Sequence, residues 1–127
     1  MARDLPITGV KDDAGASAQE TAPFFTIFVS ARNCAHLVEP CLQSLRAQTC
    51  QDFRILFVDD ASEDDTASRA ETLLRAHFAE RYRVVRNPER LGKCANAFFN
   101  IPDASSECIA ILDGDDRLAN DDILSIF

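Results

Sequence analysis

The residues best suited to chemistry follow an apolar run near the end of the sequence. Residues 108–112 are apolar, and they give way at once to Asp113, Gly114, Asp115 and Asp116. In an extended backbone, residues two apart point to the same side, so the carboxylates of Asp113 and Asp115 should converge. Carboxylate oxygens suit hard divalent cations, and glycine lets a bulky anion approach the backbone. We therefore predict a metal site at Asp113 and Asp115 that bridges to a diphosphate. The competing interpretation is a solvated turn.

Two further polar clusters follow apolar runs in the same way. Ser30–Asn33 follow the first run, and Asp59 and Asp60 follow the second. Aspartates at the end of a strand often cap the next helix. Ser62 and Asp65 already provide a capping pattern there. We therefore expect Asp59 and Asp60 to contact a ligand, and nucleoside hydroxyls or base N–H groups are natural targets for a carboxylate acceptor.

The loop with the sequence RNPERLGK carries three cations, Arg86, Arg90 and Lys93. A basic loop that faces an acidic metal site is suited to diphosphate recognition. We expect one of the three cations to make this contact. The nearby aromatic pair, Phe98 and Phe99, is expected to pack in the core rather than to form a stacking platform.

The elements that must position these residues alternate along the chain. Buried strands are predicted at residues 24–29, 53–58, 82–85 and 109–112. Helices are predicted from Leu37 to near Gln48, from the Ser62–Asp65 cap to Phe78, and at residues 96–100. This order predicts an α/β fold, a three-layer Rossmann-like arrangement with a mostly parallel sheet flanked by helices. The loops after its strands gather at one edge, which brings the polar clusters together.

Composition narrows the class of protein. The chain has 127 residues, of which 46% are hydrophobic and 27% charged, as in one ordinary domain. A net charge of −8 argues against a nucleic-acid partner. No apolar run reaches the roughly 20 residues of a membrane span, and no secretory signal is recognisable, so we expect a cytoplasmic location. The five cysteines are expected to be buried free thiols. Residues 1–22 are interpreted as a flexible leader without strands or helices, and residues 23–127 as one domain.

Four segments together carry a resemblance to a known family. They are FFTIFVSARN, CLQSLRAQTCQDFRILFVDDASEDDT, VVRNPERLGKCANA and CIAILDGDDRLANDDIL, and they occur in this order. The chain from about residue 24 to residue 127 resembles the N-terminal, nucleotide-sugar-binding half of a family 2 glycosyltransferase with the GT-A fold.

The resemblance implies transfer of a sugar from a nucleotide diphosphate sugar, UDP-sugar above all, to the hydroxyl of an unidentified glycan, lipid or protein acceptor. It implies Mn²⁺ or Mg²⁺ as cofactor. It also assigns a role to each matching position. The base packs against Ser30, Ala31, Arg32 and Asn33, and the nucleoside is contacted by Asp59 and Asp60. The donor pocket is lined by Lys93 and Asn96, ribose and the metal-bound diphosphate are contacted by Asp113 and Asp115, and Asp116 is a further metal ligand.

The sequence departs from the family pattern at two places. The common Pro-Thr-Tyr-Asn after the first strand is here Ser-Ala-Arg-Asn, so the usual aromatic neighbour of the base is absent. The chain also stops just past the acidic residues, inside an expected helix, and contains no match for the family's catalytic base. We therefore expect a domain truncated at its C-terminus that binds nucleotide weakly and transfers no sugar.

Three other interpretations compete with this one. A non-catalytic nucleotide-binding fragment or interaction module is the alternative that fits the same sequence. A phosphoacceptor receiver domain would need an acidic pair after the first strand, where this chain has SARN. A nucleotidyltransferase would show a glycine-rich basic loop at that position, and none is present.

Overall fold

The chain folds around one five-stranded sheet. The computed structural model describes residues 7–8, 22–103 and 105–127. The strands lie in the order β1-β4-β3-β2-β5, with β2 to β5 parallel and β1 antiparallel to β4. They are β1 (Ile7–Thr8), β2 (Phe25–Ala31), β3 (Phe53–Asp59), β4 (Tyr82–Arg86) and β5 (Cys108–Asp113). The predicted mostly parallel α/β fold is confirmed.

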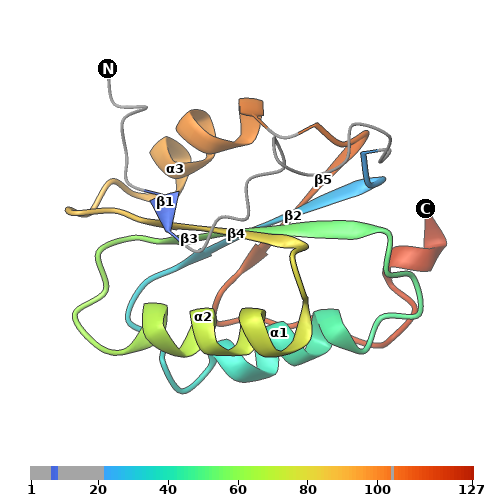
Figure 1. The fold of residues 1–127 in the computed structure, drawn as a ribbon, viewed down its shortest axis with the longest axis horizontal. Helices are drawn as coiled ribbons and strands as arrows, with labels where there is room; N and C mark the ends of the chain where they lie inside the picture. The colour runs from blue at the N-terminus through green and yellow to red at the C-terminus, as the bar shows by residue number, and fades with distance from the viewer. Residues whose placement is uncertain (1–6, 9–21, 104) are drawn as a thin grey trace.

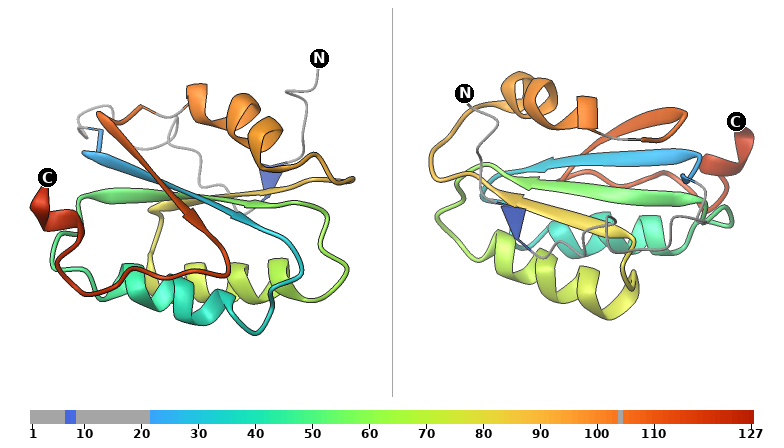
Figure 2. Two further views of the ribbon diagram at one scale, coloured as in Figure 1. Left: turned by 180° about the vertical axis from the view of Figure 1, so that it is seen from behind. Right: turned by 45° about the horizontal axis from the view of Figure 1, so that its top comes forward.

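Helices cover both faces of the sheet. They are α1 (Val38–Arg46), α2 (Thr66–His77) and α3 (Lys93–Asn100), with 3₁₀ turns η3 (Ile101–Asp103) and η4 (Leu124–Ile126). Helices α1 and α2 pack side by side below the sheet in Figure 1, and α3 lies above it. Figure 2 shows the same three layers from two other directions. A helix was expected at the end of the chain, where the structure has the short turn η4.

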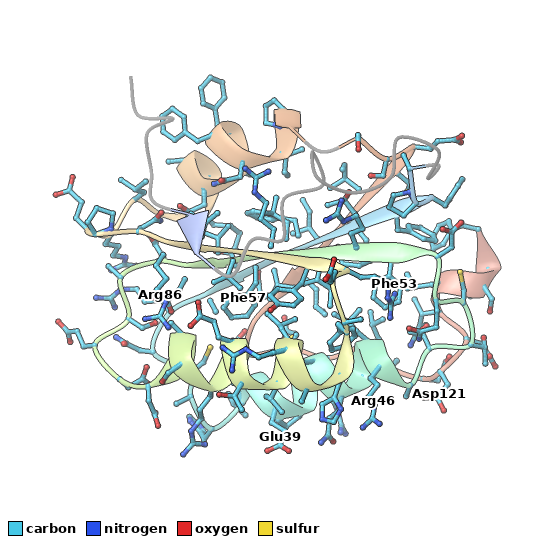
Figure 3. All side chains as sticks on the ribbon, in the orientation of Figure 1. Glu39, Arg46, Phe53, Phe57, Arg86 and Asp121 are labelled. Carbon is cyan, nitrogen blue, oxygen red and sulfur yellow. The ribbon has the colours of Figure 1, made fainter. Side chains whose placement is uncertain are left out.

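The larger core lies between the sheet and the pair α1 and α2. Alternate residues of β2, such as Phe25, Ile27 and Val29, point into it, together with Phe53 and Phe57 of β3. Figure 3 shows Phe53 and Phe57 on the side of the sheet that faces these helices. A smaller cluster under α3 contains Phe28, Leu56, Val58 and Val85. Strands buried on both faces need continuous apolar runs, which is the pattern that the sequence has.

Helix α2 begins differently from the predicted capping pattern. The N-cap residue, Asp65, makes no side-chain capping bond. Asp64 takes that role, because its Oδ1 accepts hydrogen bonds from the backbone N–H (3.0 Å) and the hydroxyl of Thr66. Ser62 instead donates its hydroxyl to the Oδ1 of Asp59 at 2.6 Å. The predicted Ser62–Asp65 cap is therefore wrong, because Asp64 makes the capping contact instead, although the helix itself is confirmed.

Helix α3 starts three residues earlier than predicted. Gly92, at φ 91°, turns the chain into the helix, and its carbonyl accepts a hydrogen bond from Asn96 N at 3.0 Å. Asn96 is completely buried, whereas the Phe98 side chain is 70% exposed. Two residues correspond to about 200° of helix rotation, so Phe98 points away from the face that Asn96 buries. The expected core packing is thus wrong for Phe98, which contacts the half-buried Phe99 edge to face.

Strand β5 forms one edge of the sheet. Among the described residues, only β2 pairs with it. Leu112 faces the larger core, and Ile109 packs on the opposite side against the smaller cluster. Because side chains alternate along a strand, Ile111 shares the face of Ile109, and it is 61% exposed. This edge therefore combines unpaired backbone groups with an exposed apolar side chain.

The other edge carries the short strand β1. A leader without strands was expected over residues 1–22, but Ile7 and Thr8 pair with Val85 and Val84 of β4. Residues 1–6 and 9–21 lie outside the described residues, and so does the expectation of flexibility there. Within the described part of the chain, no helix combines the length and apolar composition needed to cross a membrane.

All five cysteines are free, as expected, but they are not all buried. Cys34 and Cys41 are buried, whereas Cys94 is exposed and the other two are intermediate. Burial raises the pKa of Cys41 to about 12, so its side chain is a thiol at neutral pH. The Cys41 thiol lies 3.7 Å from the backbone carbonyl oxygen of Asp113, to which it is a weak donor.

Candidate functional site

The polar clusters after β2, β3 and β5 meet at one edge of the sheet. The strands are parallel and in register there, with Ala31 opposite Asp59 and Ser30 opposite Asp113. The residues that follow surround a hollow of about 220 Å³. Its lining is Ser30, Ala31, Arg32, Cys34, Asp60, Arg90, Gly92, Lys93, Asp113 and Asp115. Most of the residues predicted to bind nucleotide therefore lie around one concave surface.

The acidic group at the end of β5 is compact enough to hold a cation. Carboxylate oxygens of Asp113, Asp115 and Asp116 all lie within 4.8 Å of one another. Asp115 and Asp116 are exposed, and Asp113 is partly exposed. The turn is held by Gly114 N, which donates to the carbonyl of Ser30 at 2.9 Å. Three oxygen donors at this spacing fit a hard divalent ion such as Mn²⁺ or Mg²⁺.

Glycine is required at position 114 for a packing reason. A Cβ atom at this position would lie 2.5 Å from the Cβ of Ala31 and 3.1 Å from its Cα. The turn of the acidic group therefore rests directly on the backbone of β2. The sequence suggests that Gly114 allows a ligand to approach, whereas the structure shows that it allows the turn after β5 to approach β2 closely.

Lys93 already provides one positive charge for this group. Its Nζ lies 2.7 Å from Oδ1 of Asp113 and donates to Oδ2 at 2.8 Å. The side chains are 54% and 33% exposed, respectively, so both remain accessible to solvent. The hydrogen bond to Asp113 and its negative charge raise the pKa of Lys93 above the usual lysine value. The first turn of α3 thus delivers a cation to the end of β5.

Asp60 is buried and holds the loop between β4 and α3. Its Oδ1 accepts hydrogen bonds from Asn87 Nδ2 (2.9 Å) and Leu91 N (2.8 Å). Its Oδ2 accepts from Gly92 N at 2.9 Å. Burial by itself would raise the pKa of Asp60, but these hydrogen bonds outweigh burial and lower it. Asp60 therefore shapes the loop that carries the neighbouring cations.

Asn96 extends the same buried network. Its Oδ1 accepts a hydrogen bond from Asn87 Nδ2 at 2.6 Å, and both asparagines are buried. Asn96 was predicted to contact the donor, but it does not line the hollow and instead supports Asp60 through Asn87. Asn87 is a member of this network that sequence reasoning missed. An asparagine that opens a loop is too common a signal to single out.

Asp59 and Asn33 support the turn after β3 and do not line the hollow. Asp59 accepts hydrogen bonds from the backbone and hydroxyl of Ser62. The side-chain carbonyl of Asn33 accepts from Glu63 N at 2.7 Å, and Asn33 N donates to Ser62 Oγ. Their position therefore favours a structural role, because both hold the loop that leads into α2.

The three cations of the basic loop take different positions. Lys93 and Arg90 line the hollow, whereas Arg86 forms an ion pair with Glu71 of α2. Arg32 also lines the hollow, and its buried Nε has no hydrogen-bond partner among the described residues. Arg32 therefore retains a donor that a ligand acceptor could use.

The acidic group borders a second hollow. It has a volume of about 400 Å³ and is lined by Leu37, Pro40, Asp115, Asp116 and Arg117. Asp116, a predicted metal ligand, faces this hollow and not the first one, and Asp115 lines both. The acidic group thus separates two concave surfaces of different composition.

Comparison with known proteins identifies the family. Residues 26–127 match the sequence model of glycosyl transferase family 2. The chain belongs to this family. A glycosyltransferase for PGL/p-HBAD biosynthesis in Mycobacterium tuberculosis is 33% identical over 69 residues, which cover 54% of this chain and 27% of that protein. An uncharacterized protein from the same species is 34% identical over 102 residues, which cover 80% of this chain and 31% of that protein.

Solved structures of glycosyltransferases share the fold. The mannosyltransferase PcManGT from Pyrobaculum calidifontis, in complex with GDP-Man and Mn²⁺, is 27% identical with a TM-score of 0.74. The match covers 83% of this chain and 31% of that one. TarS from S. aureus in complex with UDP is 24% identical with a TM-score of 0.71, over 80% of this chain and 30% of that one. The chain therefore spans about a third of the length of the family members it matches.

Proposed function

We propose that this chain binds the nucleotide diphosphate part of a sugar donor, with UDP-sugar as the expected donor, together with Mn²⁺ or Mg²⁺. It would do so as the donor-binding part of a glycosyltransferase that acts on an acceptor hydroxyl. The observation that carries the proposal is the hollow that Asp113 and Asp115 line together with Arg32, Arg90 and Lys93. A metal-bound diphosphate combines a positive metal ion with negative phosphate oxygens. It therefore needs carboxylates for the metal ion and arginine or lysine side chains for the phosphates.

Each side of the hollow has a distinct part in this proposal. Asp113 and Asp115 would hold the cation from the end of β5, with Asp116 as a further ligand from the adjacent turn. Arg32 and Arg90 would donate hydrogen bonds to phosphate oxygens or to the base, since arginine presents several donors in a planar fork. Ser30 and Ala31 form the wall at the end of β2. A bound divalent cation neutralises charge that develops on a departing diphosphate.

The relative with bound ligands supports the choice of donor class. PcManGT was solved with GDP-Man and Mn²⁺ and shares the fold at 27% identity. The base is a separate question, because an arginine, Arg32, stands where the family commonly has an aromatic residue. We expect the chain on its own to bind donor and not to transfer sugar, since no residue in it matches the acceptor-activating base of the family.

The proposal predicts metal-dependent binding that Asp115→Asn weakens. UDP-, GDP- and dTDP-sugars would be titrated calorimetrically into the wild-type chain with and without Mn²⁺. Loss of a carboxylate ligand should weaken binding in Mn²⁺ by about tenfold or more, since even residues that support a metal ligand contribute about 10–100-fold. Without Mn²⁺, the variant and the wild type should differ little.

Asp121→Asn is the matched control, because it removes the same charge at the opposite end of the molecule from Arg86, at the end of β4 (Figure 3). It should bind like the wild type. Equal binding by wild type and Asp115→Asn in Mn²⁺ would refute the donor site. Sugar transfer by the isolated chain would refute the expectation that it only binds.

A further inference from the structure

We propose that Lys93 is a built-in counter-cation of Asp113 that a divalent metal must displace, and that the displaced ammonium then binds the diphosphate. The proposal rests on the proposed function, because it assigns a role to Lys93 within the same site. In this proposal the lysine side chain has two alternative states, one paired with Asp113 and one bound to the diphosphate.

The geometry of the ion pair is that of a chelated cation. The Nζ atom lies 2.7 Å from one oxygen of Asp113 and 2.8 Å from the other. A metal ion bound to Asp113 would use the same oxygens, at about 2.0–2.6 Å. An ammonium and a dication on one carboxylate repel each other strongly at such distances. The two cations are therefore competitors for Asp113.

A ligand would provide Lys93 with a partner other than Asp113, as the other charged residues of the hollow indicate. The carboxylate of Asp60 is already occupied by hydrogen bonds from the loop. Asp115 has no hydrogen bond or ion pair to another of the described side chains, so it is available to the metal from the start. Once metal takes Asp113, the lysine faces two other cations that line the hollow, Arg32 and Arg90. A diphosphate offers Lys93 a new anionic partner and offsets that excess of positive charge.

The backbone beneath Lys93 is fixed, so that only the side chain has to move. Gly92 N is held by Asp60, and Gly92 O accepts the first hydrogen bond of α3 from Asn96 N. Lysine carries a compact charge on a flexible four-carbon stem, and this stem is about half exposed. The ammonium can therefore leave Asp113 without any change in the helix.

This exchange predicts opposite effects on the two ligands. Removing the ammonium frees Asp113 and strengthens the binding of metal alone, whereas it removes a partner of the diphosphate and weakens the binding of nucleotide. A lysine that only lends general positive charge to the hollow would be matched by Arg90, which lines the same surface and has no side-chain partner among the described residues. The pair Lys93→Met and Arg90→Met separates the two explanations.

The test measures Mn²⁺ alone and then UDP. Free Mn²⁺ would be followed by electron paramagnetic resonance as each protein is titrated, and UDP binding would be measured calorimetrically at saturating Mn²⁺. We expect Lys93→Met to bind Mn²⁺ about two- to fivefold more tightly than wild type, the range for loss of an exposed ion pair. Arg90→Met should differ from wild type by less than about twofold, because long-range charge effects are screened by salt. Lys93→Met should also bind UDP about tenfold more weakly.

The outcomes distinguish this proposal from the proposed function. If Lys93→Met and Arg90→Met change Mn²⁺ affinity equally, or if Lys93→Met weakens it, the exchange is refuted while UDP binding by the wild type still supports the donor site. If the wild type binds no UDP in Mn²⁺, the proposed function fails. Tighter Mn²⁺ binding by Lys93→Met alone would still show that the lysine competes for Asp113. Circular dichroism of each variant verifies that it is folded.

Discussion

At the scale of single residues, Asp60 shows how a carboxylate can serve a site without facing it fully. It is 4% exposed, and its three hydrogen bonds go to Asn87, Leu91 and Gly92. A buried carboxylate is costly unless it is well bonded. Asp60 therefore holds the loop between β4 and α3 in place, and the hydrogen bonds from this loop stabilise the buried carboxylate of Asp60. Its replacement should alter the positions of Arg90 and Lys93 even if no ligand touches Asp60.

The lowered pKa of Asp60 leads to a prediction about pH and stability. A carboxyl group with a folded-state pKa below its ordinary value of 3.8 stabilises the fold above pH 3.8. This contribution is lost as the pH falls through the folded-state pKa. Asp60→Asn should therefore be less stable than wild type at pH 7 by about 1–3 kcal/mol, and the gap should narrow below pH 3.8. Urea unfolding of both proteins at pH 7 and pH 3 measures it. A gap that stays constant between these pH values would contradict the assignment.

At the scale of elements, the contact between the turn after β5 and strand β2 fixes the acidic group in place. Gly114 lies against Ala31, and its N–H donates to the carbonyl of Ser30. Asp113 and Asp115 flank this glycine on both sides. The spacing between the two carboxylates therefore depends on how closely the turn can approach β2.

We predict that Gly114→Ala destabilises the fold by about 1–3 kcal/mol, the usual range for overpacking. It should also weaken Mn²⁺ binding, because the turn must move away from β2. The double variant Ala31→Gly with Gly114→Ala removes the clash between the two Cβ atoms and should recover part of both losses. Thermal unfolding and Mn²⁺ titration of the two single variants and the double variant measure this coupling. Strictly additive effects would show that the contact is not the cause.

The sequence predicted the elements better than the contacts between them. The strands were predictable because Phe25–Val29 and Phe53–Val58 are continuous apolar runs that end at polar residues, and the parallel order placed those ends together. The proximity of Asp113, Asp115 and Asp116 was predictable for the same reason. The spacing of the three aspartates within one short segment is visible in the sequence. The apolar strand before them determines at which edge of the sheet they lie.

The contacts of Asp60 and Lys93 could not be predicted in this way. Asp60 bonds to residues about thirty positions later, and Lys93 meets Asp113 twenty positions later. Such pairs depend on how a loop folds after the sheet has formed. The predicted cap at Ser62 was wrong for a different reason, since Asp59, only three positions earlier, accepts its hydroxyl. The Ser62 oxygen also accepts a hydrogen bond from the backbone N–H of Asn33, a long-range contact that a local capping pattern does not show.

At the scale of the whole molecule, the two faces of the sheet are covered unequally. Two helices and the larger core lie on one face, and the short helix α3 and a four-residue cluster lie on the other (Figure 1). Strand β5 sits at the edge of this thinner side, with Ile111 61% exposed. Unprotected apolar edge strands tend to pair with other chains.

We predict that the 127-residue chain self-associates through β5 as its concentration rises. Ile111→Lys should reduce this association, because a charged side chain on an edge strand opposes pairing. Phe98→Lys is the control, since Phe98 is also a large apolar residue and is 70% exposed but lies on α3. Sedimentation velocity over a range of concentrations measures the difference. Equal effects of the two variants would point to general hydrophobic attraction instead of strand pairing.

The edge strand also links self-association to ligand binding. Strand β5 ends at Asp113, so a second chain paired along it would lie next to the proposed metal ligands. We expect such pairing to alter the surroundings of Asp113, and two coupled binding equilibria shift each other by the same factor. The apparent affinity for metal and nucleotide should therefore change with protein concentration. With Ile111→Lys, the apparent affinity should not change with protein concentration. This variant would therefore allow the ligand affinity of the site to be measured without self-association.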